Sequence, residues 1–70
     1  MKKLREALGV NVRRMRQSKG WSQEELCARS GVSQSYVSQV ESGLRSVSID
    51  VIDQLASALD VTPDQLLKGR

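Results

Sequence analysis

One short pattern occurs four times in this chain and constrains its fold more than any other feature. An apolar residue precedes a Ser or a Thr, and a second apolar residue follows five positions after the first. The pattern is typical of a helix start, because the hydroxyl caps free backbone N–H groups and the two apolar side chains pack across the cap. The capping residues are Ser22, Ser33, Ser48 and Thr62. Four helices are therefore expected to begin directly after these positions.

A further helix is expected before the first cap. Apolar residues recur there at steps of four, four and three, as one stripe of a helix requires: Leu4, Leu8, Val12 and Met15. Gly20 is well placed to end this helix in a left-handed turn. Gly9, inside it, weakens the helix by about 1 kcal/mol relative to Ala and allows a neighbouring element to pack closely. At two of the later starts, Ser22 with Glu25 and Thr62 with Gln65 are expected to form complete capping boxes.

The expected helices cover residues 2–18, 23–29, 34–41, 49–58 and 63–68. No alternating run of β-branched residues supports a strand. The fourth helix has a clear apolar face, formed by Ile52, Leu55, Ala56 and Leu59. No linker or repeat interrupts the pattern, so residues 1–70 are expected to form a single all-α domain, a compact bundle of five helices.

Composition excludes several classes of function. The chain has one Cys and no His, so neither an intrachain disulfide nor a zinc site is expected. Without a histidine, a plausible nucleophile–base pair or a sizeable core, an enzyme is not expected, nor is a cofactor or a small-molecule ligand. No apolar run approaches the roughly 20 residues of a membrane span. A cytoplasmic protein that does not bind membranes is the resulting expectation.

Charge is distributed unevenly along the chain. Residues 1–45 contain nine Lys/Arg and four Asp/Glu, whereas residues 46–70 contain two Lys/Arg and four Asp/Glu. A basic first part and an acidic second part suggest one face turned toward a polyanion. A set of solvated helix faces explains the same charges equally well, so charge alone leaves both interpretations open.

The second and third expected helices carry the clearest functional signal. Between them Gly31 permits a sharp turn, with the small Cys27 one helical turn before it. Val37 and Val40 give the third helix a narrow apolar edge for docking. This spacing is that of a helix-turn-helix, here spanning roughly residues 23–41, whose second helix enters the major groove of DNA. The free side of that helix carries Gln34, Ser35, Ser38 and Gln39, side chains that can bond to base edges.

These residues resemble a known family. Residues 21–27 (WSQEELC) and 30–43 (SGVSQSYVSQVESG) are similar to the Xre family of helix-turn-helix repressors, which includes the phage Cro and CI-type repressors. Weaker similarity extends the match from about residue 8 to residue 67. The resemblance implies a five-helix domain of the lambda-repressor-like type. It also implies a regulator of transcription, usually a repressor or autoregulator, that binds double-stranded DNA as a homodimer on a palindromic operator.

The resemblance also implies roles for single residues. Gln23 matches a position that contacts a phosphate and braces the recognition helix. Glu41 matches a structural acid and is expected to pair with Arg13 or Arg16. The remaining matches are positions near bases or the DNA backbone: Ser33, Gln34, Ser35 and Gln39 for bases or nearby phosphates, Tyr36 and Ser38 near the backbone, and Arg45 for phosphate.

Some alternatives remain open at this point. Many family members have Ala at the position of Cys27 and Pro at that of Val47. Cys27 is interpreted as a buried small hydrophobic residue, with a redox-sensing thiol as the alternative. The adjacent Leu66 and Leu67 point in different directions on a helix, so one of them is expected outside the core, where it would serve self-association. The alternative function is a protein-interaction module that keeps the fold without binding specific DNA.

Overall fold

The computed structural model describes residues 2–68 and contains, within that range, five α-helices and no strand. They are α1 (Lys2–Ser18), α2 (Gln23–Ser30), α3 (Gln34–Glu41), α4 (Ile49–Leu59) and α5 (Pro63–Leu67). All five expected helices are confirmed, and the predicted ends differ from the observed ones by at most one residue. None of the described helices is both long and apolar enough to cross a lipid bilayer.

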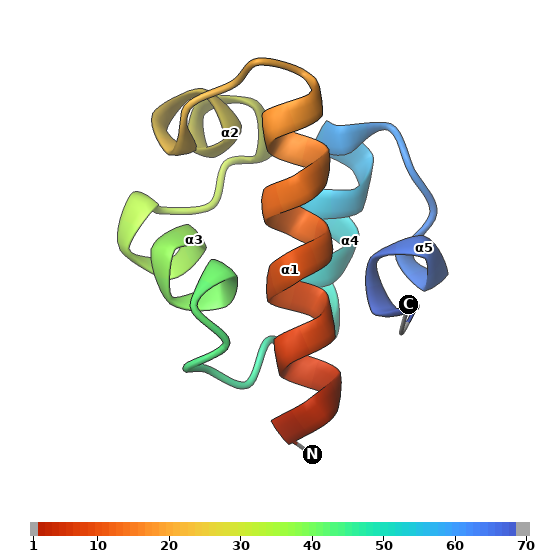
Figure 1. Cartoon of the computed structure of the whole chain (residues 1–70). Helices are drawn as coiled ribbons and strands as arrows, with labels where there is room; N and C mark the ends of the chain where they lie inside the picture. Colours follow the sequence, from red (N-terminus) through yellow and green to blue (C-terminus); the bar gives the residue numbers. More distant parts are fainter. Residues whose placement is uncertain (1, 69–70) are drawn as a thin grey trace.

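The longest helix organises the molecule. In Figure 1, α1 runs through the centre, with α2 and α3 on one side, α5 on the other and α4 behind it. α1 packs against α3, α4 and α5, and α2 packs against α3 and α4. The pair α2–α3 therefore forms one flank of the domain, opposite the short last helix.

The helix starts follow the predicted capping chemistry. The hydroxyl oxygens of Ser22, Ser33 and Ser48 accept a hydrogen bond from the backbone N–H three residues later, over 3.1 to 3.2 Å. At α5 the backbone N–H of Thr62 donates to Oε1 of Gln65 over 2.9 Å. Each cap satisfies a donor that the first helical turn leaves free.

The capping box expected at Ser22 is only half formed. The serine hydroxyl accepts from the Glu25 N–H, but the Glu25 carboxylate accepts instead from Arg29 Nε over 2.6 Å, one helical turn further along α2. An arginine four residues after a glutamate competes for the carboxylate that the box requires. This part of the prediction was wrong.

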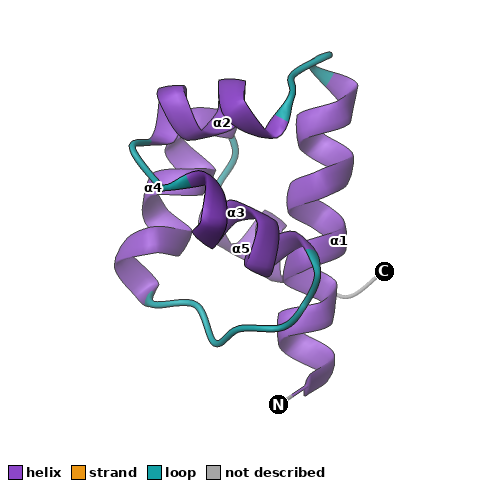
Figure 2. Cartoon of the chain, turned by 90° about the vertical axis from the view of Figure 1, so that its left-hand side faces the viewer, coloured by secondary structure: helices purple, strands orange, loops and turns teal. Residues whose placement is uncertain are grey.

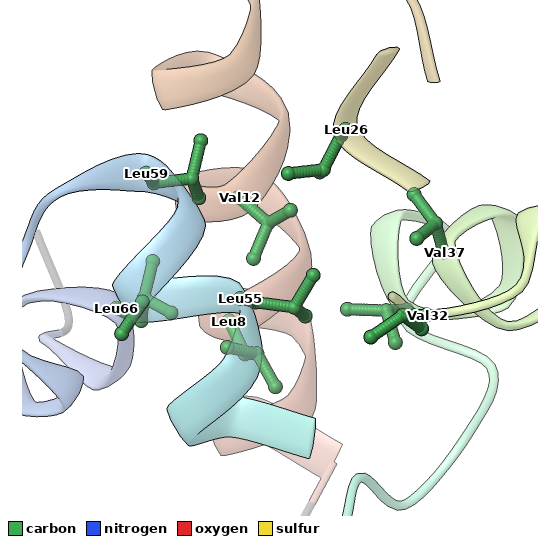
Figure 3. Close-up of a cluster of buried hydrophobic side chains, with 10 residues drawn as sticks. Leu8, Val12, Leu26, Val32, Val37, Leu55, Leu59 and Leu66 are labelled. Atoms are coloured by element: carbon green, nitrogen blue, oxygen red, sulfur yellow. The ribbon is translucent and has the colours of Figure 1, made fainter. Parts of the chain in front are cut away.

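The core is formed by side chains from every helix and from the turn between α2 and α3 (Figure 3). Its buried members are Leu8, Val12, Leu26, Val32, Val37, Val40, Leu55, Ala56, Leu59 and Leu66. The stripe predicted on α1 is confirmed at three of its four residues: Leu8 and Val12 are buried, and the half-buried Met15 packs against the core. Leu4, near the start of α1, is 50% exposed.

α1 and α3 pack closely at Gly9. A Cβ atom at this position would lie 2.4 Å from the carbonyl oxygen of Val40 and 2.9 Å from that of Glu41. The expectation of close packing is therefore confirmed, and the neighbour is the backbone at the end of α3.

Asn11 was not singled out in the sequence, yet it is the buried polar residue of the described core, 6% exposed. Its Nδ2 donates to the carbonyl oxygens of Leu66 at 2.7 Å and Lys68 at 2.8 Å. Carbonyls at the end of a helix have no partner within it. Asn11 supplies that partner from α1 and fixes α5 against the long helix.

Candidate nucleic-acid interface

The turn between α2 and α3 has the geometry predicted for a helix-turn-helix. Gly31 ends α2 with a φ of 78°, and its N–H donates to the carbonyl of Cys27 over 2.8 Å. Val32 is buried directly after it, and Ser33 caps α3. A positive φ costs glycine little, so the chain turns within three residues. Figure 2, which views this flank directly, shows α2 running across the top of α3.

α3 has two distinct sides. Val37 and Val40 face the core and are 0% and 1% exposed. The exposed side carries four uncharged polar side chains, which the helical repeat places together on the opposite half of the helix. They are Gln34, Ser35, Ser38 and Gln39. In Figure 2 α3 lies on the face turned toward the viewer.

A nearly buried ion pair holds the end of α3 to α1. Arg16 Nε donates to one carboxylate oxygen of Glu41 over 2.7 Å, and Arg16 Nη2 donates to the other over 3.0 Å. The side chain of Glu41 is only 4% exposed and that of Arg16 only 11%. Arg16 Nη1 also donates to the carbonyl of Trp21 over 2.8 Å. The hydrogen bonds to Glu41 raise the pKa of Arg16 above its ordinary value. Of the two predicted partners of Glu41, Arg16 is confirmed as the one it pairs with.

Gln23, at the start of α2, joins the same network. Its Nε2 donates to Glu41 Oε1 over 3.1 Å. The half-buried glutamine thus connects the beginning of α2 to the end of α3. This is the bracing expected from the family resemblance, and the second hydrogen of the Gln23 amide is still available to a phosphate.

Arg45 lies against α3 although it belongs to the loop that follows it. Its guanidinium is 4.2 Å from the centre of the Tyr36 ring, and Nη1 donates to Gln39 Oε1 over 2.9 Å. The hydroxyl of Tyr36 accepts from the Ser48 N–H over 3.4 Å. Three of the predicted site residues therefore form one cluster, which the sequence did not predict.

Ser33 is exposed, and its oxygen already caps α3 by accepting from the Tyr36 N–H. A hydroxyl is both donor and acceptor, so its hydrogen remains able to donate to a phosphate or a base. The structure thus places all eight predicted residues on or beside α3: Gln23, Ser33, Gln34, Ser35, Tyr36, Ser38, Gln39 and Arg45.

Two further side chains near this flank, Trp21 and Cys27, pack partly against the core. The Trp21 ring is half-buried against the core and carries the guanidinium of Arg29 at 4.3 Å and the ammonium of Lys19 at 5.3 Å. Cys27 is half-buried rather than fully buried as interpreted. Burial raises the pKa of its thiol. A raised pKa favours the neutral thiol, which is less reactive than the thiolate.

Comparison with known proteins agrees with this geometry. A helix-turn-helix family model matches residues 12–66. A hypothetical transcription factor of Neisseria meningitidis is 44% identical over 64 residues, which are 91% of this chain and 60% of that protein. The restriction-modification controller protein C.AhdI of Aeromonas hydrophila is 45% identical and has a TM-score of 0.84, with 89% of this chain and 94% of that one covered.

A third similar protein was solved with DNA bound. It is the master regulator for biofilm formation SinR in complex with DNA, 34% identical, with a TM-score of 0.83 and coverage of 87% of this chain and 98% of that one. The chain belongs to the helix-turn-helix family that includes these regulators, and the predicted resemblance to the Xre family is confirmed. The chain spans about 60% of the length of its Neisseria relative.

Proposed function

We propose that the protein is a non-enzymatic, sequence-specific DNA-binding regulator of transcription, a repressor or autoregulator that acts in the cytoplasm. The observation that carries the proposal is the division of α3 into a buried apolar edge and an exposed half of uncharged polar side chains. An α-helix fits the major groove, and amide and hydroxyl groups there bond to base edges. The names of the similar proteins support the same class of function.

In this proposal the base edges are read mainly by the exposed side chains of α3, with Ser33 at its start. The surrounding groups hold the domain on the DNA backbone. Gln23 and Arg45 keep N–H donors for phosphates beyond those used in the hydrogen bonds described above. Phosphate contacts set the position of the helix, and base contacts provide the sequence preference.

The active form is proposed to be a homodimer. One recognition helix reads only a few base pairs, and each correct pair contributes about 1–3 kcal/mol, too little to outcompete a genome of non-specific sites. The proposed contact surface includes α5, on the side of the molecule away from α2 and α3. There Leu66 is buried, while Leu67 is half-buried and lines an open hollow of about 170 Å³ with Leu4, Val47 and Ile52.

Selection of bound DNA from a random pool tests both parts of the proposal. We expect enrichment of a near-palindrome whose half-site centres lie about 34–36 Å apart, one turn of the duplex. A single asymmetric site, bound by one protomer in sedimentation, would exclude the dimer but not the regulator. Failure to enrich any sequence would contradict specific DNA binding and favour a protein-interaction module.

Gln34→Ala tests whether the exposed half of α3 reads bases. We expect a loss of about 1–3 kcal/mol on the selected site and little change on random DNA, because a base contact is absent from non-specific complexes. Gln17→Ala removes an exposed glutamine of α1, whose side chain makes no hydrogen bond within the described residues, and is the matched control. Equal losses on both kinds of DNA for Gln34→Ala would remove this residue from the reading surface.

A further inference from the structure

Exposed apolar side chains gather at one end of the molecule. Leu44 and Ile49 are the most exposed large apolar residues of the described part of the chain, at 75% and 82%, and they lie at the two ends of the loop between α3 and α4. Leu4, near the start of α1, is half exposed. Figures 1 and 2 both show this loop and the start of α1 at the same end of the domain. A group of exposed apolar residues marks an interaction surface, whereas single ones do not.

The open hollow described above lies at this end and offers space for one side chain. Ile49 stands beside it, because it is one helical turn before Ile52, which lines the hollow. A space of about 150 Å³ between aliphatic side chains can hold a benzene molecule. The hollow of about 170 Å³ can therefore take one aliphatic side chain. Its apolar walls are Leu4, Val47, Ile52 and Leu67.

The charges around the hollow are complementary to each other. Arg5 lines the hollow and donates through Nη2 to Ser46 Oγ over 2.9 Å. Asp53 is exposed on α4, on the same side of the helix as Ile49, four residues before it. Neither Arg5 nor Asp53 forms an ion pair within residues 4–68. A hydrogen bond to a hydroxyl leaves the guanidinium its charge and further donors for a carboxylate.

We propose that a second copy of this chain inserts its Ile49 into the hollow and pairs its Asp53 with Arg5. The contact rests on the proposed function, because it assigns the residues that join the proposed homodimer. A two-fold axis makes it reciprocal, so that each protomer fills the hollow of the other and two Arg5–Asp53 pairs form. A second copy is favoured over a small apolar ligand because one surface carries both the projecting side chain and the hollow that fits it.

The contact is compatible with DNA bound at α3, and it is small. Val47 lines the hollow, whereas Arg45 of the same loop lies against α3, so the exposed half of α3 stays free. The Cα atoms of the domain span 28 × 21 × 19 Å. Two copies whose recognition helices lie about 34–36 Å apart on DNA meet through a small part of their surfaces. Small interfaces are weak. The dimer is therefore expected to form mainly on the operator.

Sedimentation of the wild type, Ile49→Ala and Val10→Ala tests the contact, with free protein and with the selected palindrome or a single half-site. Ile49→Ala should raise the dissociation constant of the dimer at least about a hundredfold, because each dimer loses two buried aliphatic side chains. It should bind the half-site like the wild type but lose cooperativity on the palindrome. Val10→Ala removes an exposed aliphatic side chain that does not line the hollow and should behave like the wild type.

Reversal of the two charges tests the pairing. Arg5→Asp alone and Asp53→Arg alone each place like charges at the contact and should raise the dissociation constant about tenfold. The double variant restores opposite charges, so its association should return close to that of the wild type. Glu24→Arg reverses an exposed acid on α2 and is the matched control, because it should not rescue Arg5→Asp. Melting curves establish that the variants are folded.

Three results would overturn the contact. They are an Ile49→Ala variant that dimerises like the wild type, a double charge reversal no better than the single ones, and a wild type that binds the two half-sites independently. With a near-palindrome still enriched from the random pool, each of them would leave the DNA-binding regulator intact. A wild type that enriches no sequence would instead contradict the proposed function, and association of the free protein would still test the contact.

Discussion

Adding a single methyl group at Gly9 has two effects of opposite sign on the stability of the fold. Replacing glycine by alanine inside a helix normally stabilises it by about 1 kcal/mol. Here the added Cβ would meet the carbonyl oxygens of Val40 and Glu41 at 2.4 and 2.9 Å, and these backbone atoms cannot move without shifting α3. Overpacking of this kind costs about 1–3 kcal/mol or more. We expect the clash to dominate.

Gly9→Ala should therefore lower the free energy of unfolding by about 1–3 kcal/mol, measured by denaturant titration. The neighbouring Val10→Ala is the control, because Val10 is 48% exposed and its truncation creates no cavity in the core. A variant Gly9→Ala more stable than the wild type would show that α1 and α3 are not in backbone contact at this point.

At the scale of the elements, residues 4–68 contain two ion pairs with similar distances but different surroundings. Arg16–Glu41 joins α1 to α3 and is nearly buried, whereas Arg29–Glu25 lies along α2 with side chains 51% and 44% exposed. Removing one partner of a buried pair leaves the other charge without compensation, which costs about 3–5 kcal/mol. Exposed pairs contribute about 0–1 kcal/mol, because water screens them.

We accordingly expect Glu41→Ala to destabilise the fold by about 3 kcal/mol and Glu25→Ala by less than about 1 kcal/mol in thermal or chemical unfolding. Glu41→Ala also removes the acceptor of Gln23, so the placement of α3 on α2 should loosen. Equal destabilisation by the two substitutions would mean that the Arg16–Glu41 pair is as solvated as the pair on α2.

The elements differ in how far the sequence could predict them. Ser22, Ser33 and Ser48 act on backbone groups three residues away, so their caps could be recognised locally. Asn11 bonds to carbonyls more than fifty residues away, and an isolated asparagine in a helix gives no sign of such a partner. The capping box at Ser22 is an intermediate case. Its residues are local and could be recognised, but another nearby residue, Arg29, binds the Glu25 carboxylate that the box requires.

The candidate site divides in the same way. The exposed side chains of α3 could be predicted because helical periodicity fixes which residues face away from Val37 and Val40. The family resemblance predicted Arg45 as a residue near phosphate. Its contact with Gln39 depends on the path of the loop between α3 and α4, which no periodic pattern encodes.

At the scale of the whole molecule, a chain of 70 residues buries a smaller share of its surface than a longer one, so little stability is left to spare. Leu55 lies in the middle of α4 and is completely buried. Leu55→Ala is expected to cost about 2–5 kcal/mol, a large share of the 5–15 kcal/mol typical of a folded domain. The midpoint of thermal unfolding should fall, and a substantial fraction of the variant should be unfolded at moderate temperature.

Ile49→Ala is the matched control on the same helix. Ile49 is 82% exposed, so its truncation removes few contacts, and we expect a change of about 0.5 kcal/mol or less. An unfolding curve of Leu55→Ala that coincides with that of Ile49→Ala would contradict the placement of α4 against the core.

The two-sided character of α3 has a consequence for how such a protein changes over evolutionary time. The residues that dock the helix, Val37, Val40 and Glu41, lie on one half of it, and the exposed polar residues lie on the other. Mutations on the exposed half change the free energy of unfolding little. After a gene duplication, these residues can therefore change to bind a new operator while the fold is kept. One half of this eight-residue helix can therefore change the DNA sequence that is recognised, while the other half maintains the fold.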